Sequence, residues 1–140
     1  MIDRVPLPDN TEYELVIKNE ESSVVIRKLS VIGQGGSCIV YKGIKHISID
    51  EKKEEASVVV KEFYPVGLDI ERTEDMCLRI NDEQNYNALK AHFVDGQLNH
   101  IRIYERFRDQ ILPRPFMLGY ANNTVYSVSD PWERQNSVID

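Results

Sequence analysis

The residues best suited to hold a phosphate group are Gly33, Gly35 and Gly36, which lie close together in one short stretch. Glycine leaves room where a backbone approaches a bulky anion, and it tolerates torsion angles that other residues avoid. Such a stretch can close over phosphates, although any glycine-rich hairpin tip has a similar composition. The next residues, from Cys38 to Lys42, are typical of a strand. The stretch is therefore expected to join two antiparallel strands.

Two familiar phosphate-binding motifs are excluded by the residues that come after the glycines. A Rossmann turn leads into a helix whose N-terminus faces the pyrophosphate, whereas these glycines lead into the strand-forming run Ile39-Val40-Tyr41. A Walker loop needs Gly-Lys followed by Ser or Thr, and the sequence has no such tripeptide. Further along the chain, the apolar run from Val58 to Val60 is typical of another strand, and it ends in Lys61.

The segments that would position these residues are several strands and one helix. β-Branched and aromatic residues indicate strands, and apolar residues at helical spacing indicate the helix. The order of these segments predicts an α+β fold, with a five-stranded antiparallel sheet, one main helix against one face, and an N-terminal β-hairpin as an extension. The predicted strands are Tyr13–Ile17, Val24–Ile32, Cys38–Lys42, Ser57–Phe63, Ile111–Tyr120 and Val125–Val128, and the helix runs from Glu83 to about Phe107.

The connections are predicted from polar and turn-forming residues. Residues 48–55 are charged and lack periodicity, so an exposed connection is expected there. Residues 69–79 are expected to contain a small hairpin, and Asn122 and Asn123 are expected to form a tight turn. The predicted organisation is an irregular leader over residues 1–12, one domain over 13–130, and a hinge and tail over 131–140.

Composition and charge limit the classes of partner. The chain has 140 residues, enough for one domain, and its 41% hydrophobic and 29% charged content is ordinary for a folded protein. Its formal charge of −6 argues against binding to nucleic acid or to a membrane surface. No apolar run approaches the roughly 20 residues that span a bilayer, so a cytoplasmic location is expected. Cys38 and Cys77 lack the spacing of a metal site or a disulfide framework, so two free thiols are expected.

Taken in order, these motifs resemble the N-terminal lobe of protein kinases, of the bacterial serine/threonine kinase or pseudokinase type. Gly33 to Val40 resembles the kinase glycine-rich loop, and Val58 to Phe63 resembles the third strand, which carries the nucleotide-binding lysine. Val125 to Asp130 resembles the fifth strand running into the hinge between the lobes. The resemblance covers roughly residues 26 to 130.

The resemblance implies an ATP-binding site. The glycine-rich loop would cover the phosphates, the lysine would contact the α- and β-phosphates, two valines would sandwich the adenine, and the hinge would supply backbone hydrogen bonds. Magnesium commonly accompanies ATP, but the residues that bind it in kinases are absent from this chain. The implied nucleotide-binding residues are Gly33, Gly35, Gly36, Val40, Val59, Lys61, Ser129 at the gatekeeper position, Asp130 and Trp132.

Two positions depart from the kinase pattern. Cys38 stands where the loop of the family has its third glycine. Gln97 stands where the family places a helix glutamate that pairs with the strand lysine, and an uncharged amide cannot form that ion pair with Lys61. Glu105, two turns later, is the rival candidate for the glutamate position.

The catalytic motifs of kinases, His-Arg-Asp and Asp-Phe-Gly, do not occur in the sequence. The 140-residue chain is therefore expected not to transfer phosphate alone, and serine/threonine kinase activity is expected only within a longer protein that supplies a C-terminal lobe. A second hypothesis is a non-catalytic, pseudokinase-like module that binds a protein partner. An N-terminal lobe without a C-terminal lobe would expose apolar residues that normally meet that lobe, so self-association or contact with another protein domain is expected. A third hypothesis is an unrelated α+β domain whose glycine-rich tip is accidental.

Overall fold

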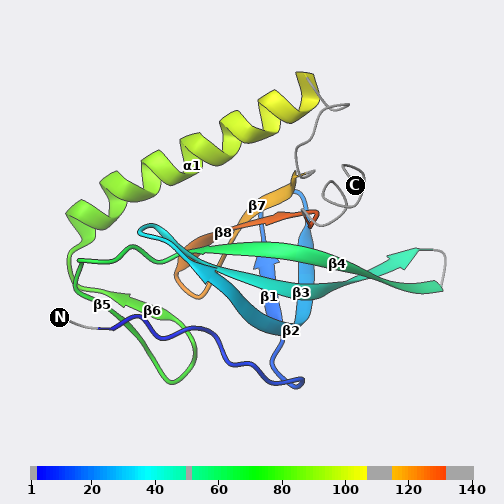
Figure 1. Cartoon of the computed structure of the whole chain (residues 1–140), viewed down its shortest axis with the longest axis horizontal. Helices are drawn as coiled ribbons and strands as arrows, with labels where there is room; N and C mark the ends of the chain where they lie inside the picture. The colour runs from blue at the N-terminus through cyan, green and yellow to red at the C-terminus, as the bar shows by residue number, and fades with distance from the viewer. Residues whose placement is uncertain (1–2, 50–51, 107–114, 132–140) are drawn as a thin grey trace, which may run out of the picture.

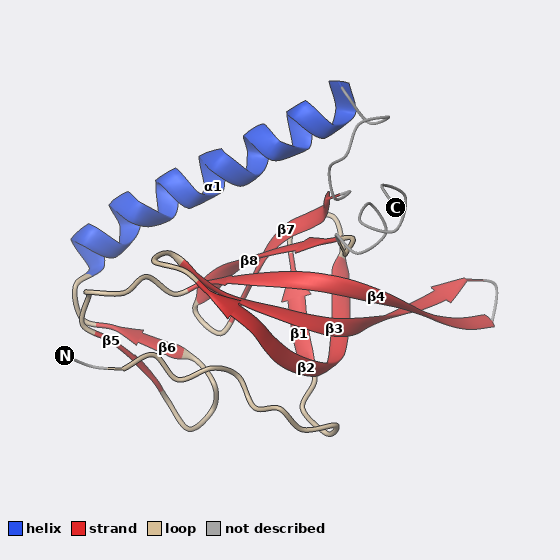
Figure 2. Cartoon of the chain, viewed as in Figure 1, coloured by secondary structure: helices blue, strands red, loops and turns tan. Residues whose placement is uncertain are grey.

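The computed structural model describes residues 3–49, 52–106 and 115–131. Six antiparallel strands form a closed barrel in the order β1-β2-β3-β4-β8-β7 (Figure 1). A two-stranded sheet and one long helix lie outside the barrel (Figure 2). The elements are β1 Leu15–Lys18, β2 Ser23–Gln34, β3 Cys38–Ile49, β4 Lys52–Phe63, β5 Ile70–Arg72, β6 Leu78–Ile80, α1 Glu83–Arg106, β7 Pro115–Ala121 and β8 Thr124–Ser129.

The prediction of a five-stranded sheet with a hairpin extension is wrong, because β1 closes the sheet into a barrel. Strand β1 pairs with β2 along its length and with β7 at Lys18 and Tyr120. Closure gives β1 a neighbour on each side, and it buries Leu15 and Ile17 inside the barrel. Gly119 permits the close approach of β7, since a Cβ atom there would lie 2.7 Å from the Cγ2 atom of Ile17.

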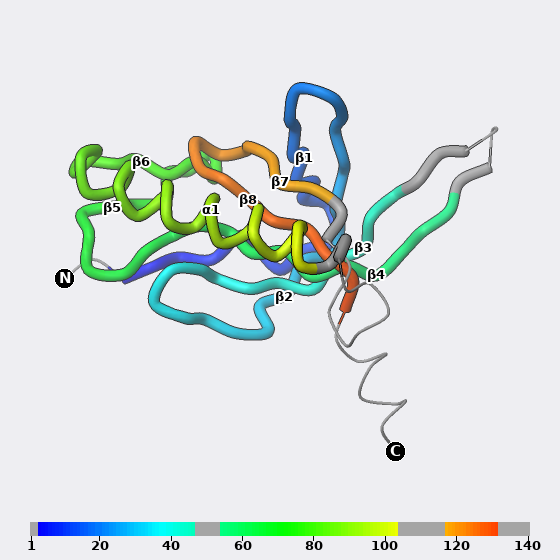
Figure 3. Tube along the Cα trace, turned by 90° about the horizontal axis from the view of Figure 1, so that it is seen from above, coloured from blue at the N-terminus to red at the C-terminus, as the bar shows by residue number. Residues whose placement is uncertain are grey.

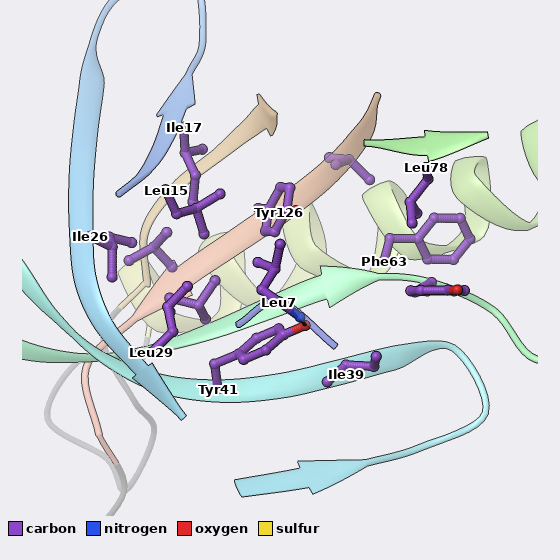
Figure 4. Close-up of a cluster of buried hydrophobic side chains, with 14 of the residues drawn as sticks. Leu7, Leu15, Ile17, Ile26, Leu29, Ile39, Tyr41, Phe63, Leu78 and Tyr126 are labelled. Atoms are coloured by element: carbon purple, nitrogen blue, oxygen red, sulfur yellow. Dashed lines mark hydrogen bonds between the residues drawn. The ribbon is translucent and has the colours of Figure 1, made fainter. Parts of the chain in front are cut away.

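The barrel interior is filled by side chains that alternate with outward-facing residues along each strand. On β4, Val58, Val60 and Glu62 are buried, whereas the intervening Val59 and Lys61 are partly exposed. Figure 4 shows the wider hydrophobic core, in which side chains of the barrel strands meet those of the leader and of β6. The labelled core residues are Leu7, Leu15, Ile17, Ile26, Leu29, Ile39, Tyr41, Phe63, Leu78 and Tyr126.

Helix α1 packs against the outside of the barrel through aromatic side chains. Tyr86 and Phe93 lie two turns apart on one stripe, and their ring centroids lie 5.4 and 5.1 Å from that of Phe63. The carboxylate of Asp82 accepts a hydrogen bond from the backbone N–H of Asn85 at 3.2 Å and caps the first turn. The predicted start of the helix at Glu83 is confirmed.

The ribbon formed by β3 and β4 is longer than the sequence predicts. The exposed connection expected over residues 48–55 instead continues the antiparallel ladder as far as Ile49 and Lys52. The ribbon projects from the barrel in both Figure 1 and Figure 3. The predicted small hairpin is confirmed as β5 and β6, and the predicted tight turn is confirmed by φ angles of 51° at Asn122 and 62° at Asn123.

The leader lacks regular secondary structure over its described residues, and part of it is buried. Leu7 is only 3% exposed, and its backbone N–H donates a hydrogen bond of 3.0 Å to the hydroxyl of Tyr41. Among the described residues, no helix has the length and apolarity needed to cross a bilayer.

Candidate functional site

Several predicted site residues lie in one transverse row on the barrel. Gly33 pairs with Val40, Val40 pairs with Lys61, and Lys61 pairs with Ser127. Paired residues in antiparallel strands project to the same face, and neighbouring strands lie about 4.8 Å apart. The backbone of Gly33 therefore lies about 10 Å from that of Lys61, across two strand spacings. Ser127 belongs to this row, although no motif in the sequence indicates it.

The side chain of Lys61 belongs to the outer face. Its neighbours Val60 and Glu62 are fully buried inside the barrel, so the alternation of the strand directs Lys61 outwards. Within the described part of the chain, Lys61 forms no hydrogen bond and no ion pair. An ammonium group without a protein partner retains its donors for an anion.

A second row lies beside the first on the same sheet. Lys42 pairs with Val59, and Val59 pairs with Ser129. The two valines predicted to contact adenine, Val40 and Val59, thus come from adjacent strands in neighbouring rows. Asp130 directly follows β8 and is partly exposed, and the predicted hinge residue Trp132 lies outside the described residues.

The glycine-rich loop is bonded to the chain that follows β4. The Ser37 carbonyl accepts a hydrogen bond of 2.9 Å from the N–H of Tyr64, and the Gly36 carbonyl accepts one of 3.0 Å from the N–H of Val66. Within the loop, the N–H of Gly35 donates to the carbonyl of Cys38 at 2.9 Å. These bonds fix the position of the loop at the end of the strand that carries Lys61.

The glycines of this loop are not required by the fold. A Cβ atom added to Gly33, Gly35 or Gly36 would meet no atom within 4 Å, and none of the three has a positive φ. A Cβ atom at Gly43, by contrast, would lie 2.7 Å from the Cγ2 atom of Ile26. The loop backbone is therefore open to an approaching group, although neither packing nor torsion explains its glycines.

Cys38 is half-buried at the position of the third loop glycine. Burial raises the pKa of its thiol to about 11, while the nearby positive charges of Lys61 and Arg4 act in the opposite direction. The thiol is therefore protonated at neutral pH.

Gln97 does not pair with Lys61. It follows Phe93 by four residues and so lies on the barrel-facing side of α1, but among the described residues no hydrogen bond joins its amide to the lysine. The side chain of its rival, Glu105, lies outside the described residues. The assignment of Gln97 to the helix-glutamate position therefore stays a prediction.

An open groove of about 460 Å³ lies elsewhere on the surface, between the start of α1 and the turn joining β7 to β8. Tyr86, Lys90, Tyr120 and Asn123 are among the residues that line it. None of the predicted nucleotide-binding residues contributes to this groove.

A buried polar network lies inside the barrel, directly behind the outer face that carries Lys61 (the candidate face). No sequence pattern indicates this network. The carboxylate of Glu62 accepts hydrogen bonds from the hydroxyl groups of Tyr41, at 2.8 Å, and Tyr126. The guanidinium of Arg72 donates to both carboxylate oxygens, at 2.8 and 2.5 Å. Burial, followed by the charge of Glu62, raises the pKa of Tyr126, which keeps its hydroxyl a donor. Because Glu62 directly follows Lys61, this network holds β4 in place beside the lysine.

Comparison with known proteins gives a likeness in fold. No family model matches the sequence, and no curated protein matches it. A solved structure described as "PpkA-294 apo form" resembles the chain with a TM-score of 0.59 and 23% sequence identity. The likeness covers 90% of this chain, which spans 38% of the length of that one. The two therefore share a fold over most of the present chain.

Proposed function

We propose that the chain binds ATP as the N-terminal lobe of a protein-kinase-like protein. The observation that carries the proposal is the row formed by Gly33, Val40 and Lys61, in which the lysine has no partner among the described residues. A phosphate group beneath the glycine-rich loop would receive the charge of Lys61 and hydrogen bonds from the open backbone. The adenine would lie against Val40 and Val59.

Binding without phosphoryl transfer is the activity proposed for these 140 residues. Phosphoryl transfer requires a group that positions the acceptor hydroxyl and groups that hold the metal. The sequence contains neither the His-Arg-Asp nor the Asp-Phe-Gly motif that supplies them in kinases. A C-terminal lobe would therefore have to provide these groups, and the lack of a bond between Gln97 and Lys61 in the described structure further separates binding from catalysis.

The proposal is tested by titrating ATP, with and without magnesium, into the protein while following thermal unfolding. A ligand that binds only the folded state at 100 times its Kd stabilises it by about 2.7 kcal/mol. We expect ATP to raise the Tm of the wild type. Lys61→Ala is expected to weaken ATP binding about tenfold or more, because it removes a charge-assisted hydrogen bond.

Lys18→Ala is the matched control, since Lys18 is exposed on β1 and belongs to neither row. It should bind ATP as the wild type does. Gly35→Ala should weaken ATP binding while leaving the Tm of the free protein unchanged, because its methyl group enters open space. Absence of any ATP-induced shift in the wild type would refute the proposal.

A protein-interaction module is the second candidate function. Apolar side chains are exposed on β2 and α1, including Ile32 at 53%, Leu89 at 41% and Ile103 at 39%. Exposed apolar surface of this kind favours a protein partner or self-association. This candidate predicts no nucleotide affinity, and it predicts a mass above that of the monomer in sedimentation at high concentration.

A further inference from the structure

The guanidinium of Arg4 joins three parts of the chain around the glycine-rich loop. Its Nη1 atom donates to the carbonyl oxygen of Tyr64 at 3.0 Å and to that of Cys38 at 3.3 Å. Its Nη2 atom donates to Oε1 of Gln34 at 3.4 Å. Gln34 ends β2, Cys38 begins β3 and Tyr64 follows β4, so one side chain connects both arms of the loop to the end of the lysine-bearing strand.

The chain that follows β4 also donates backbone hydrogen bonds to the loop. Tyr64 donates its N–H to Ser37 while its carbonyl accepts from Arg4. The planar, multiply donating guanidinium suits such a junction, because several acceptors can be engaged without rearrangement of the side chain. A lysine could not reproduce this fork.

Arg4 is presented by a backbone that is itself fixed. The carbonyl of Val5 accepts a hydrogen bond of 2.9 Å from Nε of Arg72, the guanidinium that pairs with buried Glu62. Two residues further on, buried Leu7 donates to Tyr41. The leader therefore connects the loop to the buried network behind the candidate face.

We propose that Arg4 is a positioning residue, which holds the glycine-rich loop against the end of β4 and thereby strengthens binding of the phosphate part of a nucleotide. This inference rests on the proposed ATP-binding function. Its physical basis is preorganisation, because a loop already held in place loses less conformational freedom when a ligand binds.

The first test follows amide hydrogen exchange in the full chain without ligand. Arg4→Met retains most of the apolar stem but no donors. We expect the amides of Gly35, Tyr64 and Val66 to exchange about tenfold faster in this variant, since the loss of hydrogen bonds to a charged group eases local opening. The turn amide of Asn19, which donates to Ser22, should be unaffected.

Two further variants distinguish the positioning role of Arg4 from an effect of its charge and from a general loss of stability. Arg4→Lys keeps the charge without the fork, so exchange in the loop should remain fast. Arg27→Met removes an exposed arginine that pairs with Glu14 at 2.9 Å, and it should leave loop exchange at the wild-type rate. Unchanged loop exchange in Arg4→Met, or full restoration by lysine, would overturn the positioning role.

The second test measures the affinities for ATP and adenosine. Arg4→Met should weaken ATP binding about tenfold and leave adenosine binding unchanged, because the glycines of the loop would contact the phosphates and not the adenosine part. Equal weakening of both ligands, or tighter ATP binding, would overturn the inference. Failure of the wild type to bind ATP would refute the proposed function, whereas the exchange measurement independently decides whether Arg4 holds the loop.

Discussion

At the scale of single residues, the site combines groups that the sequence pattern identifies with groups that it does not. The resemblance to the kinase pattern indicates Val40 and Lys61, and the register of the antiparallel strands places both in one row with Gly33. Arg4 reaches the loop from a leader 30 residues away from Gln34, and nothing in its local sequence indicates this. Glu62 resembles any other charged residue in the sequence, yet it is fully buried because Arg72 and two tyrosines satisfy its carboxylate.

The thiol of Cys38 gives a pH-dependent prediction at this scale. Its pKa is raised from the ordinary value of 9.0 to about 11, chiefly by burial. The unfolded chain therefore releases this proton at lower pH than the folded protein does. The stability due to the neutral thiol is fully present below pH 9 and is lost as the pH rises through 11.

Urea unfolding between pH 8 and 11 measures this effect. Between pH 8 and pH 11, we expect the free energy of unfolding to fall by up to about 2 kcal/mol more in the wild type than in Cys38→Ala. All other groups that titrate at alkaline pH are common to both proteins. Parallel pH curves for the two proteins would contradict the assignment.

At the scale of elements, prediction succeeded where one face of a segment is buried. The apolar stripe of α1 and the β-branched runs of β2 and β8 indicate their structures correctly. The outer half of the β3–β4 ribbon was missed, because charged residues without alternation have the composition of a loop. Barrel closure was also missed, because the four-residue β1 gives no local sign that it pairs on both sides.

At this scale, the stability of α1 can be tested at Gly96. The helix continues through this glycine, and a Cβ atom there would meet no atom within 4 Å. Gly96→Ala should therefore raise the free energy of unfolding by about 1 kcal/mol, because alanine has the higher helix propensity. Chemical denaturation measures the change, and a loss of stability would show that the glycine has another role.

At the scale of the whole molecule, the barrel closes where β1 pairs with β7, and the two strands approach closely at Gly119. A Cβ atom at Gly119 would lie 2.7 Å from Ile17 and 2.9 Å from the backbone oxygen of Lys18. Gly119→Ala is therefore expected to destabilise the protein by about 1–3 kcal/mol, because the strands must separate to admit the methyl group. Gly36→Ala, in open space, is the matched control.

Denaturant unfolding of both variants tests this requirement. Stability of Gly119→Ala equal to that of Gly36→Ala would show that the contact tolerates a side chain. If amide exchange in Gly119→Ala becomes faster in β1 and β7 alone, the pairing of these two strands is lost before the other strands of the barrel unfold.

Closure also determines the order in which the chain can fold during synthesis. Lys18 pairs with Tyr120, so the second neighbour of β1 leaves the ribosome about 100 residues after β1 itself. At translation rates of about 5–20 residues per second, a nascent chain carries this unpaired strand edge for roughly 5–20 s. Such an edge is a template for pairing with other chains. The growing polypeptide is therefore more exposed to aggregation, and more dependent on chaperones, than the finished barrel.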